Sequence, residues 1–479
     1  MKPGHDVYQN PLVERYASGE MLRIFSADRR YRTWRQLWIA LAEAQRELGL
    51  EISAEQIEEM RAHSDDIDYE RVAEHERELR HDVMAHITTF GESCPGARAI
   101  IHLGATSCFV TDNSDLLLIR DGLRLTLTRL AHVIAALREF ALKHRGLPTL
   151  GYTHFQPAQL TTVGKRAALW AQDFLLDFEE LDLRLKGLRF RGVKGTTGTQ
   201  ASFLRLFDDD SRKVEELDRR VTRKMGFERR FHLTGQTYSR KQDEAVLHAL
   251  SGVAQSAHKF TNDLRILQGL AEILEPFGKK QVGSSAMPYK RNPMRLERIS
   301  SLAKYVISES QNGAWVYATQ WFERTLDDSA NRRLSIPQSF LGVDALLVIA
   351  VDVVRGLVVQ PAVVRRRLLE ELPFMVSENV LMLAVRAGGD RQELHESIRR
   401  HAMEVSEARL GGEPGNDLLE RLARDPLFAA VKDRIAEVSN PASYVGRAPE
   451  QVESFFEVEV TPRIDSYLAR DEPSWDVRV

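Results

Sequence analysis

The 479-residue sequence is poor in cysteine and has no long uninterrupted hydrophobic run. Its two cysteines, Cys94 and Cys108, are too few for a disulfide framework and favour free thiols in a reducing compartment. Residues 1–8 are polar and lack the apolar core of a signal peptide. The most apolar stretch, 345–359, contains charged residues and is shorter than the ~20 apolar residues that cross a bilayer. We therefore expect a cytoplasmic protein with no membrane partner, in which 345–359 is a buried helix.

An excess of charge of either sign is also missing. The 66 Lys and Arg residues against 69 Asp and Glu residues leave a net charge of −3. A balanced chain has no global field that attracts nucleic acid or an anionic membrane. We expect no nucleic-acid partner, and any anion that the chain binds must meet a local group of cations.

Helical periodicity dominates the sequence and predicts an all-α protein. Apolar residues recur in steps of three and four over 119–141, which predicts an amphipathic helix. Its expected start is 112–114, where good N-cap residues stand, and its expected end is near Gly146, a length of roughly 45 Å at 1.5 Å per residue. Further periodic segments cover 170–185, 242–274, 295–317 and 336–359. Together these segments predict an elongated long-helix bundle.

Three helical domains are expected from the change in helix length along the chain. Residues 1–111 form the N-terminal domain, residues 112–360 the central bundle and residues 361–479 the C-terminal domain. The N-terminal domain has shorter helical patterns over 33–48 and over 54–62, the second opened by a Ser53 cap with Gln56 three residues on.

Breaks and strands are predicted at only a few places. In the C-terminal domain the expected helix breaks are Pro373, 388–389, 411–412 and Pro414. Strand-like alternation is weak throughout, and the best candidates for short extended pieces are 190–193 and 203–207.

Residues 283–293 carry the most distinctive chemistry of the sequence. The segment reads GSSAMPYKRNP and must be a loop, because it combines two prolines and a glycine with adjacent cations. Its backbone N–H groups and hydroxyls, with Lys290 and Asn292, could bind a carboxylate and stabilise negative charge that develops on it. The alternative is a surface turn with solvated charges.

This loop resembles the signature loop of the fumarase/aspartase superfamily, whose members eliminate fumarate. Further superfamily blocks occur in the expected order at 104–107 with 112–113, 153–159 and 192–200. Other segments resemble the adenylosuccinate lyase family in particular, at 15–16, 79–86, 235–241 and 321–333. The resemblance covers nearly the whole chain and is thinnest after about Asp390.

The resemblance implies an activity as well as a fold. It implies β-elimination of fumarate from adenylosuccinate, giving AMP, and from the succinyl-carboxamide ribonucleotide of purine synthesis (SAICAR), giving AICAR. The implied partners are therefore small-molecule nucleotide substrates, and the implied chemistry is general acid–base catalysis with no cofactor.

The elimination needs a base, an acid and a sink for negative charge. By resemblance Ser284 is the base, with Ser285 the alternative that spacing leaves open, and His154 is the acid that protonates the leaving nitrogen. His81 supports the orientation of the substrate or the charge of the acid. Lys290 stabilises the developing negative charge.

A metal site is the alternative interpretation of the region around His81. Asp82 and His86 stand at helical i, i+4 spacing, which suits two metal ligands on one face. No second liganding cluster accompanies them, and the family's chemistry needs no metal. We therefore expect none.

Substrate-binding residues are implied by the same resemblance. Thr106 and Ser107 would bind the succinyl carboxylates, with Asn292 beside the charge sink, and Gln236 would contact the nucleotide. The remaining implied substrate-binding residues are Arg15, Tyr16, Arg80, Asp82, Arg298, Arg324, Ser329 and Arg333. Arginine suits phosphate through its forked donors. Without the resemblance, Arg324 and Arg333 would be interpreted as ordinary exposed helix charges.

The implied site residues lie far apart in the sequence, on the ends and loops of long helices. The resemblance implies a homotetramer in which the central helices of four subunits form one core and each active site takes blocks from three chains. The alternatives are another fumarate-releasing lyase, such as an argininosuccinate lyase, fumarase or aspartase, or a non-catalytic structural protein on the same scaffold. The implied phosphate residues argue against the first, and the implied base, acid and cation argue against the second.

Overall fold

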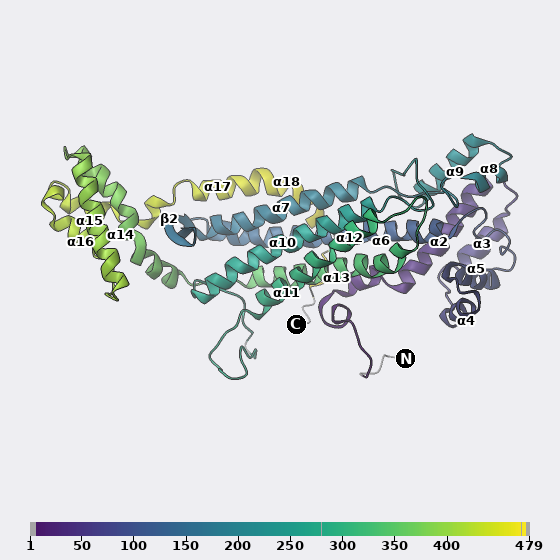
Figure 1. Cartoon of the computed structure of the whole chain (residues 1–479), viewed down its shortest axis with the longest axis horizontal. Helices are drawn as coiled ribbons and strands as arrows, with labels where there is room; N and C mark the ends of the chain where they lie inside the picture. The colour runs from purple at the N-terminus through teal and green to yellow at the C-terminus, as the bar shows by residue number, and fades with distance from the viewer. Residues whose placement is uncertain (1–5, 279, 471, 476–479) are drawn as a thin grey trace.

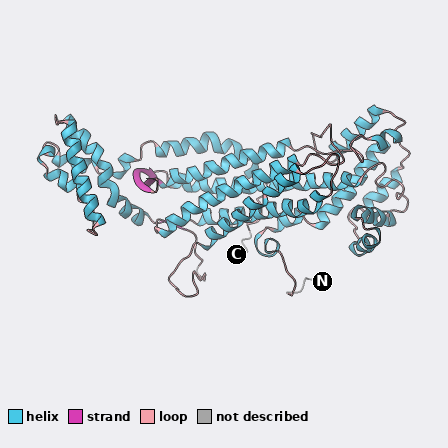
Figure 2. Ribbon diagram, viewed as in Figure 1, coloured by secondary structure: helices cyan, strands magenta, loops and turns pink. Residues whose placement is uncertain are grey.

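The computed structural model describes residues 6–278, 280–470 and 472–475. It shows an elongated bundle of long helices with a group of shorter helices at each end (Figure 1). Helix makes up most of the described chain, and the strands are short (Figure 2). The expected all-α fold class is confirmed.

The N-terminal part begins beside the middle of the bundle and ends in the short helices α3 to α5 at one end of it (Figure 1). Its elements are η1 (Leu12–Tyr16), α1 (Gly19–Ile24), α2 (Ala27–Glu47), α3 (Ala54–Ala62), α4 (Tyr69–Leu79) and α5 (Asp82–Ser93). The predicted helix over 54–62 is α3. It begins with the expected capping box, in which Ser53 and Gln56 each satisfy the other's backbone N–H.

The central part supplies the long helices. Its elements are α6 (Ser107–Lys143), β1 (Pro148–Thr153), β2 (Gln156–Thr162), α7 (Val163–Gly187), α8 (Ala201–Leu206), α9 (Ser211–Lys224), α10 (Lys241–Gly269), β3 (Ile273–Leu274), α11 (Met294–Glu309), α12 (Gln311–Ala318), α13 (Asp327–Gly356) and β4 (Val358–Val359). With 37 residues, α6 is about 55 Å long. The strands form two small antiparallel pairs, β1 with β2 and β3 with β4.

The C-terminal part leaves the bundle and then returns to it. Its elements are α14 (Pro361–Arg386), α15 (Arg391–Leu410), α16 (Leu418–Arg424), η2 (Pro426–Phe428), η3 (Lys432–Val438), η4 (Pro441–Tyr444), α17 (Ala448–Ser454), η5 (Phe455–Val460) and α18 (Thr461–Leu468). Buried side chains from α14 to η3 form a separate core, which the hairpin residues Leu150 and Leu160 join. Val452, Phe456 and Ile464 instead belong to the core of the central bundle. The expected domain 361–479 thus contains a segment that packs on the central helices.

The predicted start of the longest helix was wrong, because α6 begins at Ser107 rather than at 112–114. The polar residues that resembled an N-cap are instead buried, and they form hydrogen bonds to distant parts of the chain. Asn113 donates to the carbonyl of Gly192 over 3.1 Å, and the indole N–H of Trp34 donates to Ser114 over 3.0 Å. Their partners lie far along the chain, so local preference misplaced the helix start.

Other local predictions also failed. Residues 203–207 are largely helical, in α8, and 190–193 holds only an isolated bridge between Phe190 and Arg230. Pro373 was predicted to end a helix, but it lies inside α14 and does not interrupt it. The helix predicted over 295–317 is divided at Ser310 into α11 and α12.

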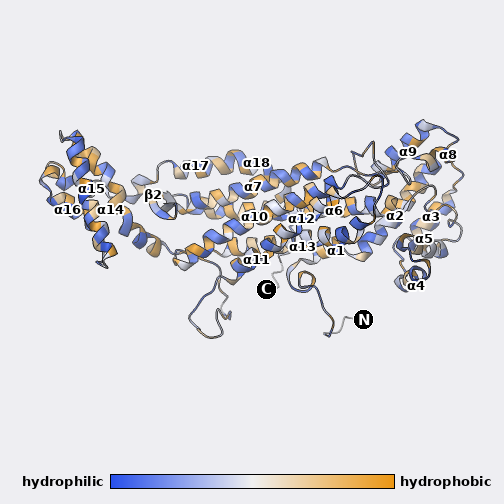
Figure 3. Cartoon of the chain, in the orientation of Figure 1, coloured by the Kyte–Doolittle hydropathy of each residue, from blue (hydrophilic) through white to orange (hydrophobic). Residues whose placement is uncertain are grey.

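The helix α13 is the most apolar of the bundle, and it is the one helix of the described residues that is long and apolar enough to cross a membrane. Of its most apolar 18-residue segment, 83% is buried inside the protein. Apolar and polar residues alternate along the neighbouring helices (Figure 3). The prediction that 345–359 is a buried helix is confirmed over the residues that lie in α13, up to Gly356.

One buried ion pair joins α6 to α13 in the middle of the bundle. Arg129 Nε lies 2.6 Å from Asp344 Oδ1, and neither side chain is exposed. The backbone N–H of Ser18 donates to Asp344, and Arg129 also pairs with Glu20 and donates to the carbonyl of Ser474. The pair therefore attaches segments from both ends of the chain to the centre of the bundle.

We predict that Asp344→Ala destabilises the protein by about 3 kcal/mol, because it leaves the Arg129 guanidinium buried with Glu20 as its remaining carboxylate partner. Chemical unfolding followed by circular dichroism measures the change. The control is Glu396→Ala, which removes an exposed, solvent-screened pair with Arg399 and should leave the stability nearly unchanged. Equal stability of the two variants would contradict the prediction.

Candidate active site

A cavity of about 620 Å³ lies between the N-terminal helices and the start of α13. This volume is typical of small-molecule sites. Eight of the implied site residues line it, namely Arg80, His81, Asp82, Ser107, Gln236, Arg324, Ser329 and Arg333. Segments separated by up to 250 residues in the sequence thus meet at one cavity.

Two helix N-termini meet at one side of this cavity. His81 is the N-cap residue of α5, and Thr106 is the N-cap residue of α6. The His81 Nε2 atom lies 3.3 Å from Ser107 Oγ, within hydrogen-bonding distance. Helix N-termini present unpaired N–H groups and the positive end of the helix dipole. This side of the cavity is suited to carboxylate groups.

Arginines from the start of α13 and the segment before it also line the cavity. Arg333 pairs with Asp82 over 2.5 Å, and Arg324 pairs with Asp328 over 2.7 Å. Ser329 lies beside them on α13. Arg324 is therefore largely shielded from solvent, whereas the Arg333 side chain is 51% exposed, as expected of a surface helix charge.

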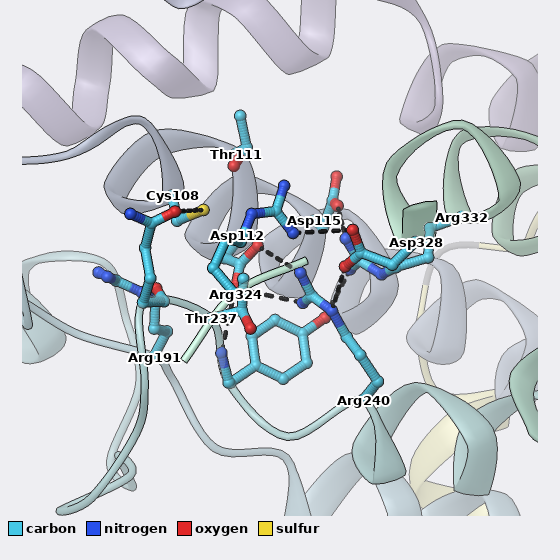
Figure 4. A network of polar contacts seen from close by, with 12 residues as sticks. Cys108, Thr111, Asp112, Asp115, Arg191, Thr237, Arg240, Arg324, Asp328 and Arg332 are labelled. Carbon is cyan, nitrogen blue, oxygen red and sulfur yellow. Dashed lines mark hydrogen bonds and ion pairs between the residues drawn. The ribbon is translucent and has the colours of Figure 1, made fainter. Parts of the chain in front are cut away.

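A buried ionic network holds Arg324 in place (Figure 4). Asp328, its partner, also accepts from Arg240 over 2.7 Å, and Arg240 pairs with Asp112 over 3.0 Å. Burial alone would raise the pKa of Asp112, but Arg240 and Arg332 hold it below its ordinary value. Asp112 therefore stays ionised and fixes the arginine that stands between the two carboxylates.

Gln236 is held by neighbours that the sequence did not reveal. Cys108 Sγ donates to its side-chain oxygen over 3.5 Å, and the buried Arg191 donates to its backbone carbonyl over 2.7 Å. Burial raises the pKa of the Cys108 thiol to about 11. The thiol therefore stays protonated and acts as a hydrogen-bond donor. As expected, Cys94 and Cys108 are both free.

The loop between β3 and α11 forms a second group of implied residues, which leaves the bundle on one side (Figure 1). Ser284 Oγ accepts the backbone N–H groups of Ala286 over 3.3 Å and of Met287 over 3.1 Å. Two N–H groups aimed at one oxygen stabilise negative charge on it. These contacts favour Ser284 over Ser285 as the base.

The ends of this loop are drawn together by Asn292 and Gly283. The Asn292 side chain donates to the Gly283 carbonyl over 2.9 Å. A Cβ atom on Gly283 would lie 2.1 Å from the carbonyl oxygen of Lys290, so only glycine fits. Lys290 is thereby held on the same loop as Ser284.

Three further implied residues meet at the first turns of α11. The guanidinium groups of Arg15 and Arg298 lie 5.8 Å and 5.6 Å from the centre of the Tyr16 ring. These are cation–π distances. Arg15 and Tyr16 come from η1, so the N-terminal segment reaches the helix that follows the signature loop.

His154 stands by itself at the tip of the β1–β2 hairpin. His154 and Phe155 form a two-residue turn, with positive φ values of 52° and 60°. Asn-Gly is the usual pair for such a turn, and a histidine and phenylalanine there are strained. Both side chains are exposed. In the single chain the imidazole is therefore open to solvent.

The structure therefore divides the implied site residues among four places, namely the cavity, the signature loop, the first turns of α11 and the hairpin. The hairpin lies at the end of the bundle opposite α5 (Figure 1), and the length of α6 separates His154 from Ser107. One copy of the chain does not bring the implied acid next to the cavity.

Comparison with known proteins identifies the fold and the family. The family model described as "Lyase" matches residues 16–308, and the model described as "Adenylosuccinate lyase C-terminus" matches 373–455. An adenylosuccinate lyase of Saccharomyces cerevisiae is 50% identical, with 97% of each chain covered. One of Schizosaccharomyces pombe is 48% identical, with 95% of each covered. The chain belongs to the adenylosuccinate lyase family.

Solved structures show that the fold extends beyond this family. A fumarate lyase from Mesorhizobium sp. BNC1 superposes with a TM-score of 0.80 at 24% identity, over 95% of this chain and all of that one. A 3-carboxy-cis,cis-muconate lactonizing enzyme from Pseudomonas putida gives 0.82 at 22% identity, over 96% and 100%. The adenylosuccinate lyase family member described here is an enzyme of the lyase class. Residues 391–455, where the sequence resemblance was thin, fall within the C-terminal family match.

His86 packs against aromatic side chains of α2. Its ring stacks on Tyr31 with centroids 4.0 Å apart and meets Trp34 edge to face. Burial and the nearby Arg35 guanidinium lower the pKa of His86 to about 4. At pH values between about 4 and 6.5, His86 is therefore mostly protonated in the unfolded chain and mostly neutral in the folded chain.

We predict that His86 makes the protein less stable as the pH falls from 6.5 towards 4, by about 2 kcal/mol at pH 5. His86→Phe keeps a stacked ring and removes the titration, so its unfolding midpoint should fall less between pH 7 and pH 5 than that of the wild type. The same substitution at the exposed His395 is the control. Parallel pH profiles for the wild type and His86→Phe would refute the assignment.

Proposed function

We propose that this family member is a C–N lyase that eliminates fumarate from adenylosuccinate and from SAICAR. The cavity carries this proposal, because two helix N-termini, at His81 and Thr106, and the arginines Arg324 and Arg333 meet at it. Both substrates carry carboxylates at one end and a phosphate at the other. The relatives named adenylosuccinate lyase support the same reaction.

The elimination is assigned to the signature loop and the hairpin. Ser284, as its alkoxide, takes a proton from the carbon beside a succinyl carboxylate, with the N–H groups of Ala286 and Met287 stabilising the alkoxide. The electron pair left on carbon forms the C=C bond of fumarate as the C–N bond breaks. Its electron pair goes to nitrogen, which His154 protonates. Lys290 stabilises the negative charge that develops on the carboxylate.

Substrate orientation is assigned to the residues of the cavity. Ser107 and Thr106, at the start of α6, bind the succinyl carboxylates together with Asn292, and His81 supports this end through its contact with Ser107. The phosphate is bound at the arginine side. Its proposed ligands in the cavity are Arg324, Ser329 and Arg333, and Arg15, Tyr16 and Arg298 are proposed to reach the phosphate from a neighbouring copy. Arg80, Asp82 and Gln236 are proposed to contact the rest of the nucleotide.

A homotetramer with shared sites is the proposed assembly. His154, Ser284 and the cavity are apart in one copy, so neighbouring copies must complete each site. Leu169, Leu176 and Leu183 follow each other at seven-residue spacing on α7 and are half or more exposed. Such a stripe is typical of a helix that packs against other helices. The two free thiols support a cytoplasmic location.

We predict that purified protein releases fumarate from adenylosuccinate and not from argininosuccinate, as followed by absorbance. Ser284→Ala and His154→Ala should each lower kcat at least ~100-fold, the usual cost of losing a general acid or base. Ser285→Ala, the adjacent serine, should keep most of the activity. Turnover of argininosuccinate, or loss with Ser285→Ala alone, would overturn the assignment.

Mixing the two inactive variants tests whether sites are shared. If Ser284 and His154 of one site come from different copies, hybrids formed at equal ratio should regain about a quarter of the wild-type activity, because that share of sites has both groups intact. Sedimentation should show a tetramer for each variant. No regained activity after verified subunit exchange would mean that both residues come from the same copy.

A further inference from the structure

The charges around the cavity are unevenly partnered. Six arginines line it, and four of them form ion pairs with carboxylates. The pairs are Arg240 with Asp112 and Asp328, Arg324 with Asp328, Arg332 with Asp115 and Asp243, and Arg333 with Asp82. Arg30 and Arg80 have no ion pair within residues 6–278, 280–470 and 472–475.

Arg30 is the more enclosed of these two cations. It lies near the start of α2 and is partly buried, whereas Arg80 is exposed at the end of α4. Arg30 Nε is shielded from solvent and has no hydrogen-bond partner in the described structure. A buried donor without a partner costs about 1–3 kcal/mol. A cation that lines a cavity without an ion pair points to an anionic ligand.

The neighbours of Arg30 on α2 show that its position is distinctive. Arg29 pairs with Asp121 over 2.8 Å, and Arg32 lies 3.6 Å from Asp65. Neither of them lines the cavity, whereas Arg30 does. Of these three arginines on α2, only Arg30 lines the cavity. Arg29 and Arg32 have carboxylate partners instead.

The charge balance explains what this cation adds. Arg324 and Arg333 would meet the phosphate with their own charges already offset by Asp328 and Asp82. Two forked donors then orient the phosphate, but the pairs supply little net positive charge to a dianion. Arg30 also lines a small neighbouring pocket with Arg332, which places it at the α13 side of the cavity.

We propose that Arg30 is a further ligand of the substrate's phosphate and supplies the net positive charge that the paired arginines lack. The identity of the anion rests on the proposed function. The Arg30 guanidinium donates to the phosphate oxygens, and the adenine and succinyl parts of the substrate are bound by other residues.

Calorimetric titration of the intact protein with AMP, adenosine and fumarate tests this role. Arg30→Gln should weaken AMP binding at least ~10-fold, the equivalent of one charge-assisted hydrogen bond. Its binding of adenosine and of fumarate should match the wild type. Arg30→Lys should recover part of the loss, because it keeps the charge without the fork. Arg29→Gln, which removes the adjacent paired cation, is the matched control and should bind AMP normally.

The outcomes separate this inference from the proposed reaction. Unchanged AMP binding by Arg30→Gln, or weaker binding of fumarate instead of AMP, would overturn the phosphate assignment. Where turnover is measured, Arg30→Gln should raise KM and leave kcat nearly unchanged, as expected for binding that is equal in ground and transition states. Failure of the wild type to release fumarate would count against the reaction alone, since AMP titration needs no turnover.

Discussion

The buried ion pair between Asp112 and Arg240 is the interaction on which the rest of the cavity depends. Asp112 lies in α6, Arg240 directly precedes α10, and Arg240 also binds Asp328 at the start of α13. A buried charge is tolerated only when it is fully partnered, so these three helix ends must meet in one arrangement. Arg324 then takes its position from Asp328. The position of Arg324 is therefore fixed by an ion-pair network that joins three helices at the cavity wall.

The fold was largely predictable because its long helices carry a regular apolar period. The failures occurred where a tertiary partner outweighs a local preference. Residues 112–114 read as a helix start, yet Asp112 is paired with Arg240 and Ser114 with Trp34. The β1–β2 hairpin was missed because its turn is His154-Phe155 rather than the Asn-Gly pair that marks such turns in a sequence.

The site was predictable through motifs and only in part through chemistry. Resemblance identified eight residues of the cavity, but a single sequence carries no signal that tells Arg30 from its neighbours Arg29 and Arg32. What distinguishes them is which carboxylates lie within reach, and those carboxylates come from other helices. Partnering between distant charges is a property of the folded chain and has no local pattern.

The length of α6 fixes the distance between two functional parts of each subunit in the proposed assembly. In the proposed tetramer this helix separates the start of one cavity, at Ser107, from the hairpin that serves another copy through His154. Removing one residue from the helix would shorten it by about 1.5 Å and turn its far end by about 100°. That end would then present its hairpin in a wrong direction to a neighbour whose own sequence is identical. The number of residues in α6 is thus constrained by Ser107 at one end and by His154 beyond the other. Insertions and deletions should therefore be far less tolerated in this helix than substitutions.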